Sequence, residues 1–201
     1  MRTPSVRRLL VDLAFDGACT AAQAVRNRGR GALASAVEGG LVVVRTHRYR
    51  PSGGARGTVP VPVVLVSRAG EELLRREEGL IPYRPPARKL AHAIGMSELR
   101  AVLGLDPGNG LRGDALEAMW VRVGGVGHGV PDAVFTDGEA WLALEYDHGK
   151  YTRQQAREKL RYASVLVDRL VWGVPSRARA EWLRGLGAEE VLVLSVPLRW
   201  P

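Results

Sequence analysis

The sequence contains a single cysteine, Cys19, and two phenylalanines. One cysteine excludes an intramolecular disulfide framework and any zinc site built from several cysteines. With so little phenylalanine, aliphatic side chains must fill most of the core that the 46% hydrophobic content allows. No apolar run approaches the roughly 18–20 residues of a membrane span, and acidic residues interrupt the N-terminal apolar run, so we find no signal peptide. We expect a soluble, cytoplasmic protein without a membrane partner.

The positive charge of the chain is unevenly distributed. The net charge is +8, yet residues 1–95 contain 16 Lys and Arg against 7 Asp and Glu, whereas residues 96–201 contain 13 against 14. This excess predicts a polyanionic partner, such as DNA, for the first half of the chain. A solvated basic face that aids solubility is the alternative, and charge alone does not decide between the two.

The first 78 residues have the pattern of a winged helix-turn-helix domain. Apolar spacing and turn residues predict three short helices, two β-branched strands around a glycine-rich loop, and a fourth helix. These elements cover residues 6–15, 21–26, 31–38, 41–49, 59–67 and 67–76. Leu33, Ala34 and Val37 form the expected inner face of the third helix. Pro60 and Pro62 place the start of the second strand at an edge or a bulge.

A winged helix puts its third helix into the major groove, and its strand hairpin reaches phosphates or the minor groove. Basic and polar residues gather at the entry to that helix and on the hairpin, where we expect them to contact DNA phosphates. They are Arg26, Asn27, Arg28, Arg30, Arg45, His47, Arg48, Arg50 and Arg56. The helix itself has few base-reading side chains, which predicts weak direct readout and shape readout by the hairpin. A protein-binding winged helix is the alternative.

The second half of the chain predicts an α/β sandwich with a mixed sheet, which makes the protein α/β (α+β overall). A proline-rich linker at 79–88 precedes it, and the second domain spans 89–201. The expected order is helix, three strands, helix, strand, helix, strand, with a loop at 106–113. These elements are predicted at 89–105, 115–123, 131–136, 140–146, 152–170, 171–174, 176–186 and 191–196.

Three acidic residues mark the second and third of these strands, which a turn at Asp137-Gly138 joins into a hairpin. Asp132 lies at the start of one strand, and Glu145 and Asp147 lie at the end of the other. Side chains alternate along a strand, so Glu145 and Asp147 point to one side, where Asp132 can join them. Three carboxylates repel one another unless a cation compensates them, which predicts a Mg²⁺ or Mn²⁺ site. Solvated strand-end acids balanced by nearby Lys and Arg are the alternative.

The residues Pro131-Asp132, followed about a dozen residues later by Glu145-Tyr146-Asp147, resemble the motif of the PD-(D/E)XK nuclease superfamily. The usual core of that superfamily, helix, three strands, helix and strand, agrees with the order predicted above. The sequence departs from the motif at Asp147, because a lysine is expected there. In such families the lysine can migrate to a neighbouring position.

The resemblance implies a metal-dependent DNA endonuclease or nickase and assigns roles to six residues. Asp132 and Glu145 would hold the metal with Asp147 assisting, a lysine would stabilise the developing phosphorane charge, and Gln155 would orient substrate or water. The candidate lysines are Lys150 and Lys159.

A second resemblance covers most of the chain. Short ordered matches make it similar to the replication-relaxation family of plasmid and mobile-element proteins, which implies DNA binding linked to plasmid replication or transfer. The matches are VVLVSRAG at 63–70, Leu73-Leu74, His92, PDA at 131–133, LEYDHG at 144–149 and EKLRY at 158–162.

Three hypotheses follow from the sequence. The first is a DNA-binding protein with a metal-dependent nuclease domain. The second is a non-catalytic DNA-binding regulator or accessory factor that uses the nuclease fold as a scaffold, which the departure at Asp147 favours. The third is a subunit of a larger transposase or restriction complex that is silent without its partners. The expected partners are DNA and either a second copy of the chain, as a homodimer, or a larger nucleoprotein complex.

Overall fold

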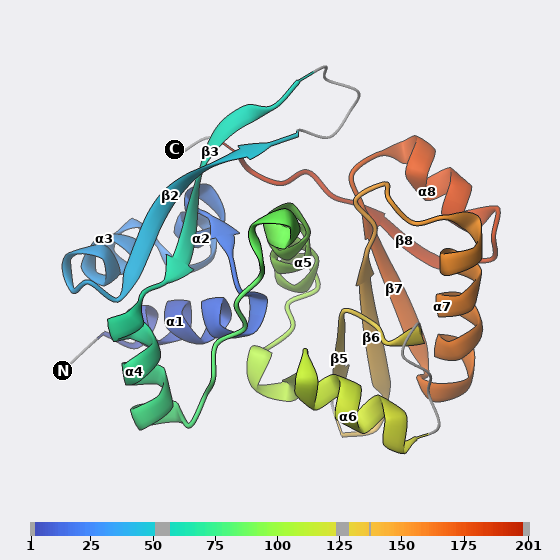
Figure 1. The fold of residues 1–201 in the computed structure, drawn as a ribbon, viewed down its shortest axis with the longest axis horizontal. Coiled ribbons are helices and arrows are strands. Elements are labelled where there is room, and N and C mark those ends of the chain that lie inside the picture. The colour runs from blue at the N-terminus through green and yellow to red at the C-terminus, as the bar shows by residue number, and fades with distance from the viewer. Residues whose placement is uncertain (1–2, 51–56, 124–128, 137, 199–201) are drawn as a thin grey trace. The chain divides into compact units, whose positions relative to one another are not determined.

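The computed structural model describes residues 3–50, 57–123, 129–136 and 138–198. It divides the chain into two compact units, the first made of Met1–Glu98 with Val196–Pro201 and the second of Leu99–Ser195. The domain boundaries expected from the sequence, at residues 78 and 88, both fall inside the first unit. Each unit combines helices with a sheet, antiparallel in the first and mixed in the second, so the protein is a mixed α/β protein (Figure 1).

Three helices open the first unit, and the apolar spacing predicted all three. They are α1 (Pro4–Asp16), α2 (Ala21–Arg28) and α3 (Arg30–Glu38). A capping box fixes the start of α2, because the Thr20 hydroxyl accepts a hydrogen bond from the Gln23 amide and the Gln23 side chain accepts one from the Thr20 amide. Apolar residues of these helices form one core with the sheet, as expected for a small domain that buries a single apolar face.

The inner face of α3 differs from the prediction. Ala32, Leu33 and Ala36 are buried, whereas Ala34 and Val37 are exposed. Residues three or four positions apart lie on one face of a helix, so Leu33 can belong to the predicted inner face or to the observed one. Four of the nine residues of α3 are alanine or valine. Because these side chains differ little in size and hydrophobicity, the sequence shows no clear apolar stripe.

The sheet of the first unit has the strand order β1-β3-β2 and is antiparallel throughout. The two long strands form the predicted hairpin, which we call the basic hairpin. Its strands β2 (Val42–Tyr49) and β3 (Val59–Val66) pair along their whole length, and β1 (Cys19–Thr20) pairs with Val63 and Val64. The first residues of β3, including Pro60 and Pro62, therefore have a neighbour on one side, which confirms the expected edge position. Helix α4 (Arg68–Glu78) follows and is capped by Ser67.

The segment after α4 returns to the first helix. The Tyr83 amide donates a 2.8 Å hydrogen bond to the Ala14 carbonyl at the end of α1. Gly17 has a positive φ of 82°, and a Cβ there would lie 2.6 Å from Pro85, so only glycine fits this close approach. The short 3₁₀ helix η1 (Ala87–Lys89) leads into α5 (Leu90–Val102).

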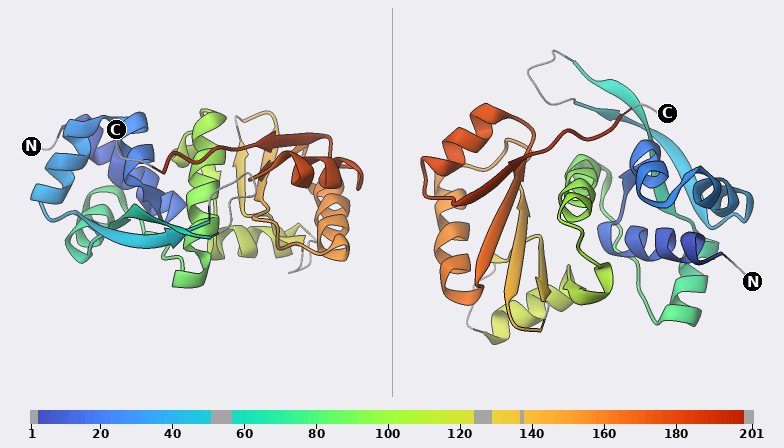
Figure 2. Two further views of the ribbon diagram at one scale, coloured as in Figure 1. Left: turned by 90° about the horizontal axis from the view of Figure 1, so that it is seen from above. Right: turned by 180° about the vertical axis from the view of Figure 1, so that it is seen from behind.

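The second unit contains a five-stranded sheet in the order β4-β5-β6-β7-β8, antiparallel up to β6 and parallel from β6 to β8 (Figure 2). The predicted hairpin of β5 and β6 is confirmed, and we call it the acidic hairpin. Asp137, where its turn was predicted, lies outside the described residues. The strands are β4 (Gly110–Leu111), β5 (Ala133–Thr136), β6 (Trp141–Tyr146), β7 (Arg169–Val174) and β8 (Glu190–Val193).

The strand predicted at 115–123 is wrong, because these residues form helix α6 (Asp114–Arg122). Leu116 and Trp120, four residues apart, are buried with Met119 packed beside them, which is helical rather than alternating spacing. The first strand of the sheet instead lies in the predicted loop at 106–113, where the 3₁₀ helix η2 (Pro107–Asn109) is followed by β4.

Two further helices complete the unit, α7 (Arg153–Leu166) and α8 (Arg177–Arg184). The helix predicted to continue to residue 170 ends at Leu166, because β7 already begins at Arg169 to pair with β6. One face of the sheet packs against α6, α7 and α8, as the two apolar clusters of this unit show. In β6, the side chains of Ala143 and Glu145 point to that face. In the described part of the chain, no helix is long and apolar enough to cross a membrane.

Candidate functional site

Asp132 and Glu145 lie close together at one end of the acidic hairpin. The register of the hairpin pairs Ala133 with Leu144, and the Asp132 amide extends it by donating to the Leu144 carbonyl at 3.1 Å. The carboxyl group of Asp132 is close enough to that of Glu145 to raise its pKa. Asp132 Oδ2 also accepts the Tyr146 amide at 2.8 Å. The structure thus brings two of the three predicted carboxylates together.

The carboxylate of Glu145 is almost completely buried and has a partner on each oxygen. Lys159, from α7, donates from Nζ to Glu145 Oε1 and also to the Val130 carbonyl at 2.7 Å. Tyr151 donates its hydroxyl to Glu145 Oε2 at 3.0 Å. The lysine side chain is 11% exposed and that of Glu145 is 1% exposed, so this ion pair is buried.

Burial and the neighbouring Asp132 raise the pKa of Glu145 well above its ordinary value, although Lys159 opposes the shift. Burial lowers the pKa of Lys159, but the negative charges of Glu145 and Asp132 outweigh it and leave the lysine pKa raised. The lysine therefore stays protonated. With both carboxylates ionised the cluster carries one negative charge in excess, so it favours either a proton or a further cation.

Asp147 does not join this pair. Its Oδ1 atom accepts from the amides of Gly149, Lys150 and Tyr151 at 2.8, 3.0 and 3.3 Å. Its Oδ2 atom accepts from Arg179 Nε at 2.5 Å. Strand β6 ends at Tyr146, so the alternation that places Glu145 no longer fixes the direction of the Asp147 side chain. Both carboxylate oxygens of Asp147 therefore bind the loop that follows it and Arg179. These contacts argue against the predicted role of Asp147 in assisting a metal ion.

The two candidate lysines differ in their contacts with the acidic residues. Lys159 reaches Glu145, whereas Lys150 is exposed and contacts the acidic residues through its backbone amide, which donates to Asp147. Gln155 is the third residue of α7, and its side chain accepts the Thr152 amide at 2.9 Å in a capping box. Both hydrogen bonds of Gln155 with Thr152 are thus local to the start of the helix, and they assign it no contact with Glu145.

The donor set suits a hard cation with two protein carboxylates. Mg²⁺ keeps several waters and is commonly held by one or two carboxylates together with substrate phosphates. Asp132 and Glu145 provide two adjacent carboxylates with an excess negative charge, and these residues fit that requirement. Among the described residues, no group of three or more His, Cys, Asp and Glu is placed to hold an ion. The predicted three-carboxylate site is therefore reduced to two.

In the first unit, two of the predicted DNA contacts are taken up by buried acids. Arg26 makes a bidentate ion pair with Glu98, with Nη1 and Nη2 at 2.8 and 3.0 Å from the two oxygens. Gln23 donates to the same carboxylate at 2.8 Å, and Glu98 is 3% exposed. Arg28 pairs with Asp12 in the same bidentate manner, at 2.5 and 3.0 Å. Both guanidinium groups thus hold the helices together.

The remaining predicted contacts lie on exposed parts of the first unit. Asn27 is half-buried and accepts from Arg26 Nε at 3.0 Å, and Arg30 is exposed at the start of α3. The basic hairpin carries the others, which are exposed except for the half-buried His47. They are Arg45, His47, Arg48 and Arg50, the last of which directly follows β2. Arg56 lies outside the described residues.

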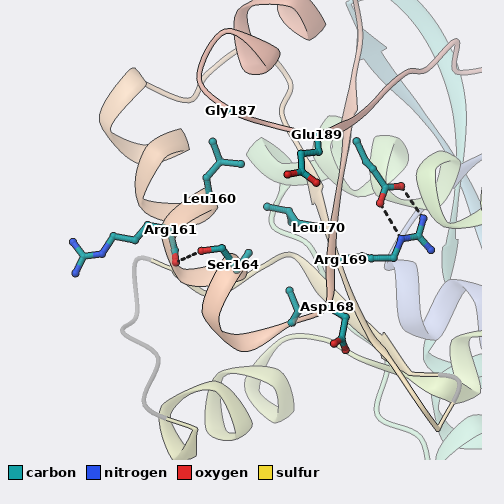
Figure 3. Close-up of a pocket in the computed structure, with 11 residues that line it drawn as sticks. Leu160, Arg161, Ser164, Asp168, Arg169, Leu170, Gly187 and Glu189 are labelled. Carbon is teal, nitrogen blue, oxygen red and sulfur yellow. Dashed lines mark hydrogen bonds and ion pairs between the residues drawn. The ribbon is translucent and has the colours of Figure 1, made fainter.

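Pockets also occur elsewhere in the described parts of the units. One, of about 290 Å³, lies beside Arg45 and the start of α4 in the first unit. Another, of about 500 Å³, lies in the second unit beside the C-terminal part of α7 (Figure 3). Arg169 and Glu190 at its rim form a bidentate ion pair at 2.9 and 2.7 Å. It opens at the start of β7, whereas Glu145 lies near the end of β6, and none of the predicted site residues lines it.

Sequence reasoning missed two residues that contact the candidate site. Tyr151 and Arg179 bind Glu145 and Asp147, respectively, and neither belongs to a motif. Tyr151 follows Asp147 by four residues, so its nearness in sequence was the only available signal. Comparisons of the chain with protein-family models, with characterised proteins and with solved structures found no match.

Proposed function

We propose that the protein binds DNA through a winged-helix first unit and hydrolyses it with a PD-(D/E)XK-like second unit that uses Mg²⁺ or Mn²⁺. The observation that carries the proposal is the cluster of Asp132, Glu145 and Lys159. Two neighbouring carboxylates and an ammonium meet at one end of a mixed sheet. The lysine comes from α7 rather than from the position after Glu145, which supports the idea that it replaces the residue missing at Asp147.

The roles of these residues follow from their charges. Asp132 and Glu145 would hold the cation, and a bound Mg²⁺ supplies Lewis-acid polarisation of a phosphodiester. Lys159 keeps a positive charge beside Glu145, where it can stabilise negative charge that develops on phosphoryl oxygens. The observed contacts give Gln155, Lys150 and Asp147 no part in this chemistry.

The DNA-binding part of the proposal depends on exposed arginines of the basic hairpin. Arg45 and Arg48 are three residues apart in β2 and therefore point to opposite sides of the strand, and Arg50 directly follows it. All three are exposed. Between Arg30 and Glu38 at the two ends of α3, the exposed residues have no long polar side chain, which supports backbone contact and weak base readout. Because Arg26 and Arg28 are paired with buried acids, we assign the phosphate contacts to the hairpin and Arg30.

Cleavage of labelled DNA in Mn²⁺ or Mg²⁺ tests the nuclease proposal directly. Single-stranded, duplex and branched substrates should be compared, and we expect Asp132→Ala and Glu145→Gln to abolish cutting while DNA affinity is retained. Asp168→Asn is the matched control, since Asp168 is an exposed acid that accepts a 2.7 Å amide hydrogen bond at the other end of the sheet. An Asp132→Ala protein that cuts as fast as the parent would refute the assignment.

A non-catalytic DNA-binding regulator is the second candidate. The observation in its favour is that both oxygens of Glu145 and both of Asp147 already have protein partners. A purified protein that binds DNA with a steep salt dependence, yet neither cuts DNA nor binds Mn²⁺, would select this function.

On the resemblance to the replication-relaxation family, we propose plasmid or mobile-element replication or transfer as the biological setting of either function. The basic first unit supports a nucleic-acid partner in that setting. Whether the acting species is a homodimer or a larger nucleoprotein complex is tested by the mass of the protein–DNA complex in light scattering, compared with the 21.8 kDa chain.

A further inference from the structure

Tyr151 fixes one half of the Glu145 carboxylate. Its hydroxyl donates to Oε2 at 3.0 Å, while Lys159 contacts Oε1. A carboxylate held on one oxygen can still rotate about its last bond, but separate donors on both oxygens define the plane of the group. The direction in which Glu145 presents its charge therefore depends on where the Tyr151 hydroxyl lies.

The ring of Tyr151 is held between two neighbours. Its edge meets the indole of Trp172, with ring centroids 5.9 Å apart and planes at 87°. Lys159 Nζ lies 5.5 Å from the centroid of the ring, within range of a cation–π contact. Trp172 is also the residue that pairs with Glu145 across β6 and β7. The ring thus contacts the two residues that flank Glu145.

The backbone of Tyr151 is held by Asp147 and Arg179. Asp147 Oδ1 accepts three successive amides, ending with that of Tyr151. Arg179 donates from Nε to Asp147 Oδ2 at 2.5 Å and from Nη2 to the Tyr151 carbonyl at 2.6 Å. The loop from 147 to 151 is therefore bound at both ends by one guanidinium group.

Arg179 is itself fixed by helix α8. Its guanidinium carbon lies 3.6 Å from the centroid of the Trp182 ring, and its side chain is 17% exposed. Arginine is suited to this place because its planar group can stack on a ring and donate in two directions at once. A continuous set of contacts therefore runs from α8 through the loop to Glu145.

We propose that Tyr151 and Arg179 are positioning residues for Glu145, Tyr151 through its hydroxyl and Arg179 through the loop that carries Tyr151. Asp147 then serves as the loop anchor rather than as a ligand. The catalytic meaning of this positioning rests on the proposed function. The positioning itself is a property of the metal-free protein and can be measured without any activity.

The first experiment observes Glu145 in the metal-free protein. In a sample with ¹³C-labelled glutamate carboxyls, the Glu145 resonance is identified by its loss in Glu145→Gln. We expect Tyr151→Phe to shift this resonance, and Tyr162→Phe to leave it in place, because Tyr162 packs beside Gly129 in another apolar cluster. A resonance that stays in place in Tyr151→Phe would overturn the proposal whether or not the protein cuts DNA.

The same measurement tests Arg179 with a control from its own helix. Arg179→Met should move the Glu145 resonance, whereas Arg184→Met should not, although Arg184 also donates to a backbone carbonyl, that of Val191, at 2.9 Å. Arg179→Lys should give an intermediate shift, since an ammonium cannot reproduce the planar two-way contact. Equal shifts in the two methionine variants would show that any loosening of α8 moves Glu145 and would overturn the role of Arg179.

The second experiment measures Mn²⁺ affinity by electron paramagnetic resonance together with DNA cleavage. Loss of such a supporting contact lowers metal affinity or activity roughly 10- to 100-fold in proteins, and we expect about tenfold weaker Mn²⁺ binding and a lower kcat for Tyr151→Phe, with KM for DNA unchanged. A variant with parental Mn²⁺ affinity and kcat would overturn the proposal. A parent protein that neither binds Mn²⁺ nor cuts would instead defeat the proposed function, and the carboxyl resonance would still decide the positioning.

Discussion

Replacing Lys159 with methionine removes the only cation that the described residues place on Glu145, and the cost can be worked from the structure. Methionine retains an unbranched apolar stem but leaves Glu145, 1% exposed, beside Asp132 without a positive charge. Removing one partner of a buried ion pair typically costs about 3–5 kcal/mol. The lost hydrogen bond to the Val130 carbonyl adds to this cost, so we expect a loss of at least about 3 kcal/mol near pH 8.

The loss should depend on pH in one direction. The pKa of Glu145 in the folded protein is raised above the value near 4.5 of the unfolded chain, and removal of Lys159 raises it further. A raised folded-state pKa gives a stabilising contribution that is complete below the unfolded pKa and is lost as the pH rises through the folded pKa. The deficit of Lys159→Met should therefore shrink as the pH falls, by up to about 1.4 kcal/mol per pH unit. Adding Glu145→Gln should restore most of the stability at pH 8.

Urea unfolding followed by tryptophan fluorescence provides the assay, because four of the five tryptophans, Trp120, Trp141, Trp172 and Trp182, belong to the second unit. Lys150→Met is the matched control, since Lys150 is exposed and should change stability by less than about 0.5 kcal/mol. The reasoning is refuted if Lys159→Met unfolds within 0.5 kcal/mol of the parent at pH 8, a margin set by the same expectation for surface changes. It is also refuted if the double variant with Glu145→Gln is no more stable than Lys159→Met alone.

Three further predictions concern the first unit. Arg28→Ala should lower its free energy of unfolding by about 2 kcal/mol, because Asp12 loses a bidentate partner, and calorimetry checks this. Arg48→Ala should leave stability unchanged but reduce the slope of log affinity against log salt by about one, as measured by fluorescence anisotropy with duplex DNA. Gly70→Ala should cost at least about 3 kcal/mol in urea unfolding, because its Cβ would lie 2.1 Å from the Leu41 carbonyl oxygen, whereas Gly31→Ala, with open space, should not destabilise.

Local patterns predicted most of the elements, and they were wrong where tertiary contacts decide. Leu116, Met119 and Trp120 have helical spacing, so the sequence itself indicates helix α6. The prediction of a strand there gave more weight to the expected succession of three strands than to this spacing. Strand β4 could not be predicted from the sequence, because two residues are too few to show a periodic pattern. Gly110 and Leu111 form a strand only through their pairing with β5.

The candidate site shows the same division. The nearness of Asp132 and Glu145 follows from a hairpin that local signals predict, so the sequence was sufficient to predict it. The choice between Lys150 and Lys159 needed the packing of α7 on the sheet, which no spacing reveals. The pairing of Arg26 with Glu98 joins residues 72 positions apart, so an arginine that reads as a DNA contact in the sequence is a structural residue in the fold.

The two prolines of β3 have a consequence for how this protein behaves in concentrated solution. Alternate residues of a strand direct their amides to the same edge, so Pro60 and Pro62 withdraw two donors from a single edge. Strand β2 remains paired with β3 at these positions, through Arg48 and Thr46, and the other edge of β3 extends beyond the two residues that β1 pairs with. A strand from another molecule would find no amide donors at Pro60 and Pro62, so the two prolines disfavour the pairing of a further strand with this part of β3.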